Sequence, residues 1–444
     1  MCDINFYDIS DEMCRIRKYA SLFDVDSVIF KCYTINGEST ITNRKRGFKM
    51  FFREHNIFKS EGTNHYRIPS IMVDNDGNVI AFCNNRKNSI EDHVEEADLV
   101  CCVRDAETEK WGDVKTICSE EKIACTIGNA IYDKETGEGM CFVMYNLAFK
   151  EFGMITPEER AELDERREKY GKKCGAFIMS TRDGGKTFEK RSFDSDRITL
   201  NHIDGNEVSV AGSGHGSCPG IQLKHGEHKG RLLVPTRVFT GRSNNGLSDL
   251  KDICLNNSIY SDDHGKTWKN SRPVQRGTGE GTLMECRDGS IYYNSRAYFF
   301  DAKRRIAHSY DGGESYTDYS VDEFLLEEIK CGCNAALLHI DIEQMKDSDK
   351  ALLPDGAQSV TIFTNPRSIL GFGMRCNMTA CYSFDEGKTW SGTKCIWGGG
   401  ASYSAMCYCE KTGRVHMLYE KGNGDCCEFG LSACEFDLDW LLSK

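Results

Sequence analysis

At 444 residues the chain is long enough to bury a large core, either as one large all-β domain or as two or three ordinary ones. Its formal net charge of −12 argues against a nucleic-acid partner, because phosphate binding requires clustered Lys and Arg. The N-terminal residues lack the apolar segment of a signal peptide, and no run of about 18 apolar residues occurs, so we expect a cytoplasmic protein without a membrane span. Non-classical export stays open.

Cysteine is abundant, at 23 residues. In a long chain without a signal peptide these residues predict reduced thiols, most of them buried as small apolar side chains. Zinc is the alternative at Cys331 with Cys333 and at Cys407 with Cys409. A spacing of one residue suits successive strand positions better than a zinc knuckle, so we expect no metal and no cofactor.

The chain begins with residues 1–48, which carry mixed charge and an apolar run at 28–30, and which we interpret as an N-terminal extension or as edge strands. Residues 49–444 have a constant pattern of short apolar runs separated by Asp-Gly, Asn-Gly and Gly-Gly turns. This pattern predicts antiparallel strands and an all-β fold.

One segment within this region has a helical pattern. Thr156 is a capping residue, Pro157 occupies the first helical position, and a charged run continues to Gly171. We expect a surface helix of about 14 residues over 156–171, inserted between two strands of one sheet. Its charges predict a solvated face, and a role as a lid that limits which leaving groups fit is the alternative.

A turn pattern, S/T-x-D-x-G-x-S/T-aromatic, occurs in four copies at residues 181–188, 261–268, 309–316 and 383–390. A fifth copy without the glycine lies at 103–111. In each turn we expect the Asp to bind backbone N–H groups, the Gly to adopt a positive φ and the aromatic ring to pack beneath. A repeated turn among short strands favours a β-propeller.

Near the start of the region, Tyr66-Arg67-Ile68-Pro69 places an arginine in an apolar strand, where its charge requires a partner. This element, together with the repeated turns, which are called Asp boxes, resembles the sialidase (neuraminidase) family over roughly residues 60–425. The resemblance implies a six-bladed β-propeller with a short helical insertion. It also implies an enzyme that acts on sialylated oligosaccharides or glycoconjugates.

The family holds the substrate carboxylate with three arginines, because planar guanidinium groups form forked, charge-assisted bonds that lysine does not reproduce. Arg67 matches the first position. Arg296 follows an Asp-Gly turn and an apolar strand, and it matches the second position. Arg375 lies just ahead of the strand that leads into the last Asp box, and it matches the third position. For any single arginine a surface ion pair is the simpler interpretation, but three matching contexts favour the carboxylate site.

The resemblance places Tyr403, in the segment Ala401-Ser402-Tyr403-Ser404, as the nucleophile. A neutral phenol avoids the repulsion that a carboxylate would meet at a carbon already bearing one, but it needs a base. Glu280 matches the family's glutamate that polarises the tyrosine, and Glu285 is the nearby alternative.

The acid/base is expected in the loop after the second strand, where Asp92 matches the family pattern and Glu91 is the alternative. Arg86 is expected to contact sugar hydroxyls or to steady Asp92, and Glu420 to orient Arg67. The glycine-rich wall at residues 211–220 departs from the family by a local insertion, and His215 within it is a further candidate contact.

The resemblance, with these matching residues, implies an exo-α-sialidase that retains configuration through a tyrosyl-enzyme intermediate, without a cofactor. Two variants of the chemistry stay open, namely transfer of sialic acid to another sugar and internal elimination to an anhydro product. A non-catalytic propeller that binds sialoglycans is the alternative from another class. A propeller that binds protein partners through its Asp boxes is the simplest alternative.

Overall fold

The structure is a computed structural model. It describes the short strands β1 (Thr34–Ile35) and β2 (Glu38–Thr40) and residues 50–92, 96–147, 156–171, 175–193, 199–203, 206–209, 212–215, 218–240, 249–369, 375–423 and 427–443. β1 and β2 form the edge of a nine-stranded sheet, and the remainder of the predicted N-terminal extension lies outside the described residues.

The described chain is all-β with few and short helices, as predicted. Its first large sheet has eight strands and consists of two antiparallel meanders joined by a single parallel bridge between Ala97 and Ala124. The first meander is β4 (Asn64–Val73), β5 (Val79–Lys87), β6 (Ala97–Arg104) and β7 (Lys115–Cys118). The second is β8 (Ala124–Asp133), β9 (Glu138–Asn146), β10 (Gly175–Thr181) and β11 (Glu189–Ser192).

The middle of the chain forms smaller antiparallel sheets. A five-stranded sheet comprises β14 (Gly212–His215), β15 (Ile221–Gln222), β16 (Leu232–Phe239), β17 (Cys254–Ser261) and β18 (Lys269–Asn270). A four-stranded meander comprises β19 (Thr278–Glu285), β20 (Ile291–Ala297), β21 (Lys303–Ser309) and β22 (Thr317–Leu326). The hairpin of β12 (Thr199–Ile203) and β13 (Asn206–Ser209) stands apart from both.

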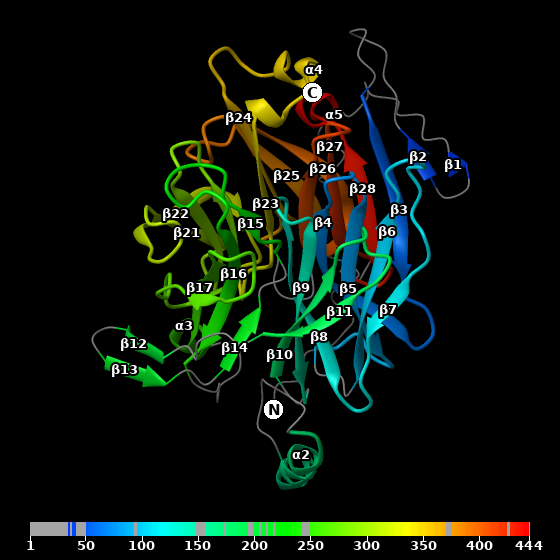
Figure 1. Ribbon diagram of the computed structural model, residues 1–444, viewed down its shortest axis with the longest axis vertical. Coiled ribbons are helices and arrows are strands. Elements are labelled where there is room, and N and C mark those ends of the chain that lie inside the picture. Colours follow the sequence, from blue (N-terminus) through cyan, green and yellow to red (C-terminus); the bar gives the residue numbers. More distant parts are fainter. Residues whose placement is uncertain are drawn as a thin grey trace, which may run out of the picture.

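The nine-stranded sheet joins the two ends of the described chain, because β3 (Phe52–Lys59) pairs with β28 (Gly430–Phe436). Figure 1 shows these strands, blue and red, side by side. The other strands are β23 (Ala336–Asp341), β24 (Ser359–Pro366), β25 (Cys376–Ser383), β26 (Gly392–Cys409) and β27 (Arg414–Lys421). β26 has 18 residues and pairs with β25 through its first half and with β27 through its second.

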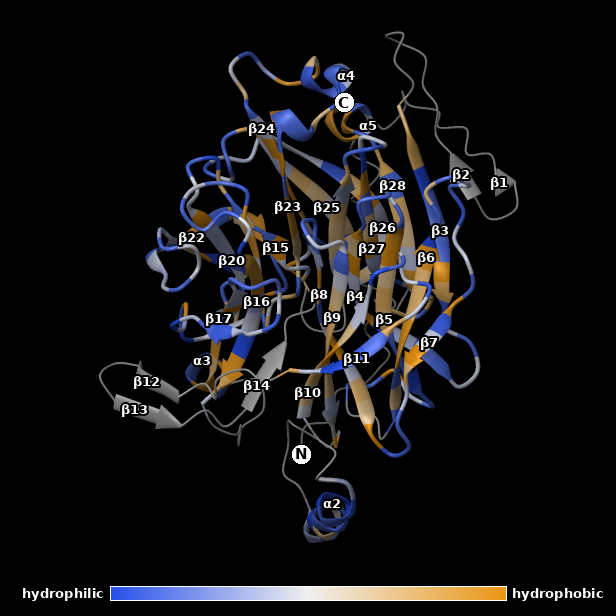
Figure 2. Ribbon diagram, viewed as in Figure 1, coloured by the Kyte–Doolittle hydropathy of each residue, from blue (hydrophilic) through white to orange (hydrophobic). Residues whose placement is uncertain are grey.

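The helix predicted over 156–171 is confirmed as α2 (Pro157–Tyr170), which has 14 residues. It connects β9 to β10, two strands that pair directly, so it is inserted within one sheet. Figure 2 shows α2 as mostly hydrophilic. Leu163 of this helix is buried. Figure 1 places it at the opposite end of the molecule from α4 (Asp347–Lys350) and α5 (Leu438–Leu442). Two further short helices are α3 (Leu250–Ile253) and η4 (Ile342–Gln344).

Each of the four Asp boxes forms the turn between two paired strands, and the predicted turn chemistry is confirmed. In the second box, Asp263 Oδ1 accepts the backbone N–H of Thr267 at 2.9 Å and Oδ2 accepts its hydroxyl at 2.6 Å. Gly265 adopts a φ of 76°, and Trp268 is buried below the turn. The fifth, degenerate copy also turns between paired strands, but its positive φ of 56° falls at Glu109, four residues after Asp105, whereas the glycine of each full box comes two residues after its aspartate.

The hydrophobic interior lies between successive meanders, and the strands carry most of the apolar residues in Figure 2. All cysteines that the structure describes have free thiols, and most are buried, as predicted. The described residues contain no cluster of three or more side chains suited to hold a metal ion. Among them there is also no helix with the length and apolar character needed to cross a membrane.

Polar side chains link the ends of strands from several sheets. Lys134, which follows β8, lies 2.6 Å from Glu410, which follows β26. Gln344 of η4 donates to the same glutamate oxygen at 2.7 Å and accepts from Lys224, which follows β15, at 2.9 Å. These contacts bring together segments that lie up to 276 residues apart in the chain.

We expect Asp263→Ala to lower the free energy of unfolding by about 1–2 kcal/mol, because it leaves the turn's N–H groups without their acceptor. Lys266→Ala, an exposed change in the same turn, is the control and should stay within about 0.5 kcal/mol. Urea unfolding at neutral pH measures both. Equal effects of the two substitutions would contradict this role for the aspartate.

Candidate active site

Arg67 is held in place by a bulge in β4 and by one buried carboxylate. The pairing of β4 with β5 shifts register between Arg67 and Ser70, and Ile68 adopts a φ of 65°, which is strained for a β-branched residue. Glu420 Oε1 accepts from Arg67 Nε at 2.6 Å and from the backbone N–H of Ile68 at 2.9 Å. Burial alone would lower the pKa of Arg67, but the Glu420 charge outweighs it and raises that pKa.

The other oxygen of Glu420 fixes the backbone that carries Tyr403. It accepts the N–H of Tyr403 at 3.1 Å, and the Glu420 side chain is fully buried. The pairing of β26 with β27 shifts register between Ala401 and Ser404, so that Tyr403 also lies in a bulge. One carboxylate therefore links Arg67 on β4 to Tyr403 on β26.

The hydroxyl of Tyr403 lies between a glutamate and an arginine. It donates to Glu280 Oε1 at 2.8 Å, and Arg296 Nη1 donates to the tyrosine oxygen at 2.8 Å and to Glu280 Oε2 at 2.6 Å. Glu280 stands within a register shift of β19 between Thr278 and Gly281. A side chain at Gly281 would collide with the ring of Tyr293, so glycine is required for this bulge.

Burial and charge set the protonation of this pair in opposite directions. Burial favours the protonated form of Glu280, but Arg296 and Arg237 outweigh it and lower the pKa of the carboxyl well below its usual range. Burial raises the pKa of Tyr403 well above its usual value, although Arg296 opposes this. In this state the phenol is neutral and the carboxylate beside it is ionised.

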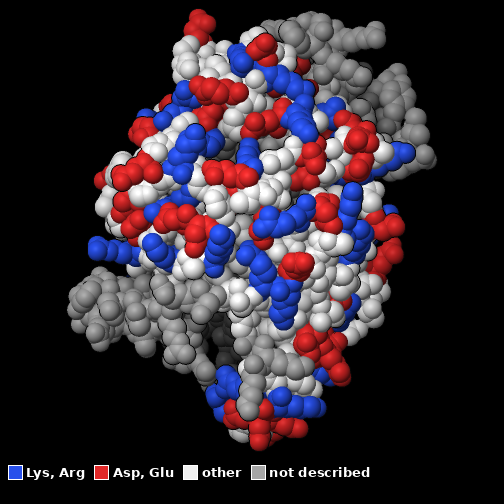
Figure 3. Space-filling model, viewed as in Figure 1, with Lys and Arg blue, Asp and Glu red and all other residues white. Residues whose placement is uncertain are grey.

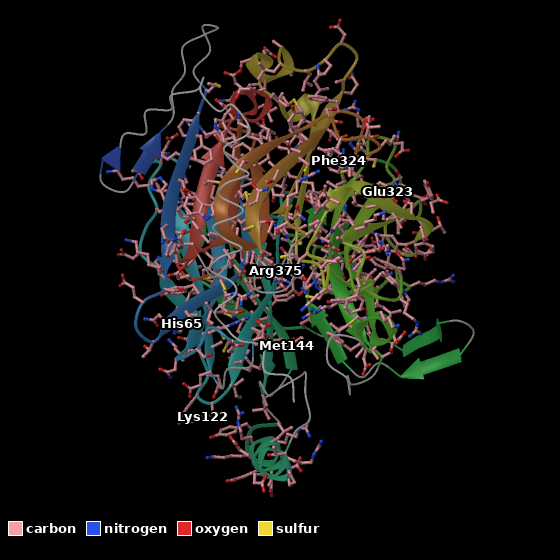
Figure 4. The ribbon with its side chains drawn as sticks, turned by 180° about the vertical axis from the view of Figure 1, so that it is seen from behind. His65, Lys122, Met144, Glu323, Phe324 and Arg375 are labelled. Carbon is pink, nitrogen blue, oxygen red and sulfur yellow. The ribbon has the colours of Figure 1, made fainter. Side chains whose placement is uncertain are left out.

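The segment between β22 and β23 holds two of the predicted arginines. Arg296 Nε donates to the carbonyl of Cys331 at 2.6 Å, and Arg375 Nη2 donates to the carbonyl of Gly332 at 2.7 Å. The Cys331 sulfur lies 3.4 Å from Arg296 Nη2 and 3.6 Å from Arg375 Nη2. Figure 4 shows Arg375 near the middle of the molecule. From the sequence, Cys331 was considered only as an alternative zinc ligand, and no motif predicted its contact with these two arginines.

The three predicted arginines therefore surround Tyr403. The Arg67 guanidinium lies 5.9 Å from the centre of the tyrosine ring, and Arg296 contacts its hydroxyl. Arg375 donates to Ser402, the preceding residue, at 3.1 Å. A carboxylate bound between these groups would lie beside the phenol.

Asp92 lies at the edge of this group, on the loop after β5. Its Oδ1 is 2.8 Å from Arg86 Nη1 and 3.9 Å from Arg67 Nη1, and 64% of its side chain is exposed. Arg86 is buried, and burial together with Arg67 lowers its pKa. Glu91 is exposed, with its backbone N–H bound to Ser89. Arg86 thus contacts Asp92, as one of its two predicted roles requires.

Glu285, the alternative to Glu280, binds elsewhere. Its carboxylate accepts the backbone N–H groups of Lys224 at 2.6 Å and of His225 at 2.9 Å, and burial raises its pKa. Among the described residues, the hydrogen bonds of Glu285 hold this loop and do not include Tyr403. His215 ends β14, and its side chain lies outside the described residues.

Besides the Cys331 contact, sequence reasoning missed one charged residue of the site. Arg237 of β16 lies 3.0 Å from Glu280 Oε1 through Nη1. The available signal was an arginine inside the apolar run Leu232–Phe239, the argument that singled out Arg67.

The fold and the site define an all-β Asp-box protein with an arginine-rich centre. The BNR repeat-like domain family matches residues 92–417, and the chain belongs to this family, the Asp-box family of the sialidases. A sialidase of Micromonospora viridifaciens is 27% identical over 385 residues, which cover 86% of this chain and 53% of that protein. A sialidase of Paraclostridium sordellii is 23% identical over 317 residues, covering 68% of this chain and 70% of that protein. The chain thus spans about half the length of the first of these relatives.

Solved structures share the fold at low sequence identity. The Hadza microbial sialidase Hz136 superposes with a TM-score of 0.62 at 19% identity, covering 85% of this chain and 66% of that one. The intramolecular trans-sialidase from Ruminococcus gnavus, in complex with oseltamivir carboxylate, gives 0.61 at 16% identity, covering 87% and 98%. At these identities the likeness concerns the fold alone.

We expect Glu420→Gln to lower the free energy of unfolding by about 3 kcal/mol, because the charge of Arg67 is left buried without its closest partner. Asp92→Asn removes the more distant and exposed carboxylate from the same arginine, and should cost less than about 1 kcal/mol. Urea unfolding of both variants measures the difference. Equal losses would show that burial does not set the strength of these contacts.

Proposed function

We propose that the protein is an exo-α-sialidase that removes terminal sialic acids from oligosaccharides or glycoconjugates with retention of configuration. The observation that carries this proposal is the hydrogen bond of Tyr403 to Glu280 in the middle of Arg67, Arg296 and Arg375. Sialic acid is a sugar with a carboxylate on its anomeric carbon, so a nucleophile beside an arginine cluster matches its chemistry.

In the proposed first step, the three arginines bind the substrate carboxylate and bring the anomeric carbon to Tyr403. The phenol oxygen forms a bond to this carbon while its proton passes to Glu280 Oε1. At the same time the bond to the leaving oxygen breaks, and Asp92 gives that oxygen a proton. The products are a sialyl-tyrosine intermediate, which is an aryl glycoside of the enzyme, and the free aglycone.

In the second step Asp92, now ionised, removes a proton from water, and the water oxygen attacks the anomeric carbon. The bond to Tyr403 breaks, and the phenol oxygen recovers its proton from Glu280. Two displacements at one carbon restore its configuration. The exposure of Asp92 supports this role, because the acid/base must reach both the leaving group and water.

A neutral nucleophile suits this site. A carboxylate in the place of Tyr403 would face the substrate's own carboxylate at short range, and like charges repel strongly where water is excluded. The phenol is kept neutral by burial, which raises its pKa, and Glu280 is kept ionised by its arginines. The proton transfer thus becomes favourable only when the new bond to carbon makes the phenol oxygen acidic.

We also propose that the strands form a six-bladed propeller around this site. The pairings divide into antiparallel groups led by β4, β8, β14 with β15, β19, β23 and the second half of β26. The pairing of β3 with β28 completes the last group from both chain ends. The polar contacts among Lys134, Glu410, Gln344 and Lys224 support an arrangement in which these strands converge.

Tyr403→Phe and Glu280→Gln should each lower kcat/KM for a fluorogenic sialoside by about 100-fold or more, because the first removes the nucleophile and the second its base. Glu285→Gln is the matched control, since it makes the same change at a buried glutamate of the same strand. It should retain activity once folding is confirmed by circular dichroism. An equal loss in all three variants would contradict these specific roles of Tyr403 and Glu280. No turnover by the wild-type protein between pH 4 and 8 would favour a glycan-binding protein.

The released sugar separates hydrolysis from the related chemistries. Proton NMR of the wild-type reaction should show the α-anomer of free sialic acid first, followed by mutarotation, because two inversions retain configuration. An anhydro sugar as the main product would replace hydrolysis by internal elimination. Sialylated acceptor as the main product would replace it by transfer.

A further inference from the structure

Arg237 is an arginine in the candidate site to which the proposed mechanism gives no role. It lies on β16 opposite Gly214 of β14, and 26% of its side chain is exposed. Its guanidinium lies 5.2 Å from the centre of the Phe239 ring. Its Nη1 reaches Glu280 Oε1 at 3.0 Å.

The two oxygens of Glu280 have different partners. Oε2 accepts from Arg296 Nη1 at 2.6 Å. Oε1 accepts from Arg237 and also from the hydroxyl of Tyr403, at 2.8 Å. Arg237 therefore binds the same oxygen that faces the phenol.

The groups that face Glu280 come from several elements. Arg237 lies on β16, Arg296 on β20 and Tyr403 on β26. Tyr298, just after β20, and Cys218, just before β15, interact with the same carboxylate more weakly. In the described part of the chain, the cations in ion-pair contact with Glu280 are Arg237 and Arg296.

These two arginines differ in their other duties. Arg296 also contacts Tyr403 and the carbonyl of Cys331, and in the proposed function it binds the substrate carboxylate. When substrate arrives, Arg296 is shared between two carboxylates, and its hold on Glu280 weakens. Arg237 keeps its position beside Oε1.

We propose that Arg237 is a positioning residue that keeps Glu280 ionised and keeps its Oε1 directed at the Tyr403 hydroxyl while substrate occupies Arg296. This inference rests on the proposed function and assigns a role that Arg67, Arg296 and Arg375 do not fill. The observed contact suits this role, since Nη1 of Arg237 binds Oε1 at 3.0 Å while the phenol keeps its own hydrogen bond to the same oxygen.

The sign of the pH effect follows from the charges. Burial raises the pKa of Glu280, and Arg296 and Arg237 lower it by more. Removal of the Arg237 charge therefore raises this pKa. Because the base must be ionised to accept a proton, the acidic limb of the kcat/KM profile should move to higher pH.

The test compares pH profiles of kcat/KM on a fluorogenic sialoside for the wild-type protein, Arg237→Gln, Arg237→Lys and Arg287→Gln. Arg287 is a matched control, because its side chain is 31% exposed and pairs with Glu343 at 2.7 Å. For Arg237→Gln we expect kcat/KM near neutral pH to fall about tenfold. We also expect the midpoint of the acidic limb to shift to higher pH by about one unit. Arg237→Lys, which keeps the charge, should keep the limb close to that of the wild type, as should Arg287→Gln.

The outcomes distinguish a failure of the proposed role of Arg237 from a failure of the proposed function. Wild-type turnover with an unchanged acidic limb in Arg237→Gln would overturn the role of Arg237 and leave the proposed function standing. A shift of equal size in Arg287→Gln would also overturn it, since it would mark a general charge effect. No turnover by the wild-type protein would overturn the proposed function, and the role of Arg237 with it.

Discussion

The site depends on one buried carboxylate that joins strands from opposite ends of the chain. Glu420 binds the side chain of Arg67 and the backbone N–H groups of Ile68 and Tyr403. Arg67 and Glu420 are 353 residues apart, so the first arginine and the phenol are aligned only when the last strands have joined the first. The pairing of β3 with β28 provides this closure, and the site cannot form in either half of the chain alone.

Charge is the second constraint, because arginines outnumber carboxylates at the site. Arg67, Arg86, Arg237, Arg296 and Arg375 face Asp92, Glu280, Glu328 and Glu420. Part of the excess is met by backbone carbonyls, those of Cys331 and Gly332. Their segment is fixed by the fully buried Arg304, which binds Glu327 at 2.7 Å and the carbonyl of Cys333 at 2.6 Å.

The outer surface differs from the site, since acidic and basic residues are interspersed over the face in Figure 3. The arginines at the site therefore attract an anion, and the mixed charges of the outer surface add little to this attraction.

Local features of the chain could be predicted from the sequence more fully than the spatial arrangement of residues from distant strands. The four Asp boxes and α2 were recognised because their signals lie within a few residues, in a cap, a glycine or a turn. Arg67, Arg296, Arg375, Tyr403 and Glu280 were found as matches to motifs, and the structure brings them together; their roles stay predictions. The contact of Cys331 was missed because its partners lie on distant strands, which no local pattern reveals. Arg237 was missed although its position in an apolar run was an available signal, and its partner Glu280 also lies on another strand. The choice of Glu280 over Glu285 could not be settled by strand alternation, because a bulge intervenes.

That bulge is part of a pattern among the strands that carry the site. The pairing shifts register at Arg67 in β4, at Glu280 in β19 and at Tyr403 in β26. In a regular strand, neighbouring side chains alternate between the two faces and pack against adjacent sheets. A bulge turns one side chain out of this alternation and leaves backbone groups to be satisfied otherwise, which is the task that Glu420 performs for Ile68 and Tyr403. The buried carboxylate and the bulges therefore depend on each other. The bulged backbone directs the reactive groups inward, and the Glu420 carboxylate stabilises the bulges at Ile68 and Tyr403.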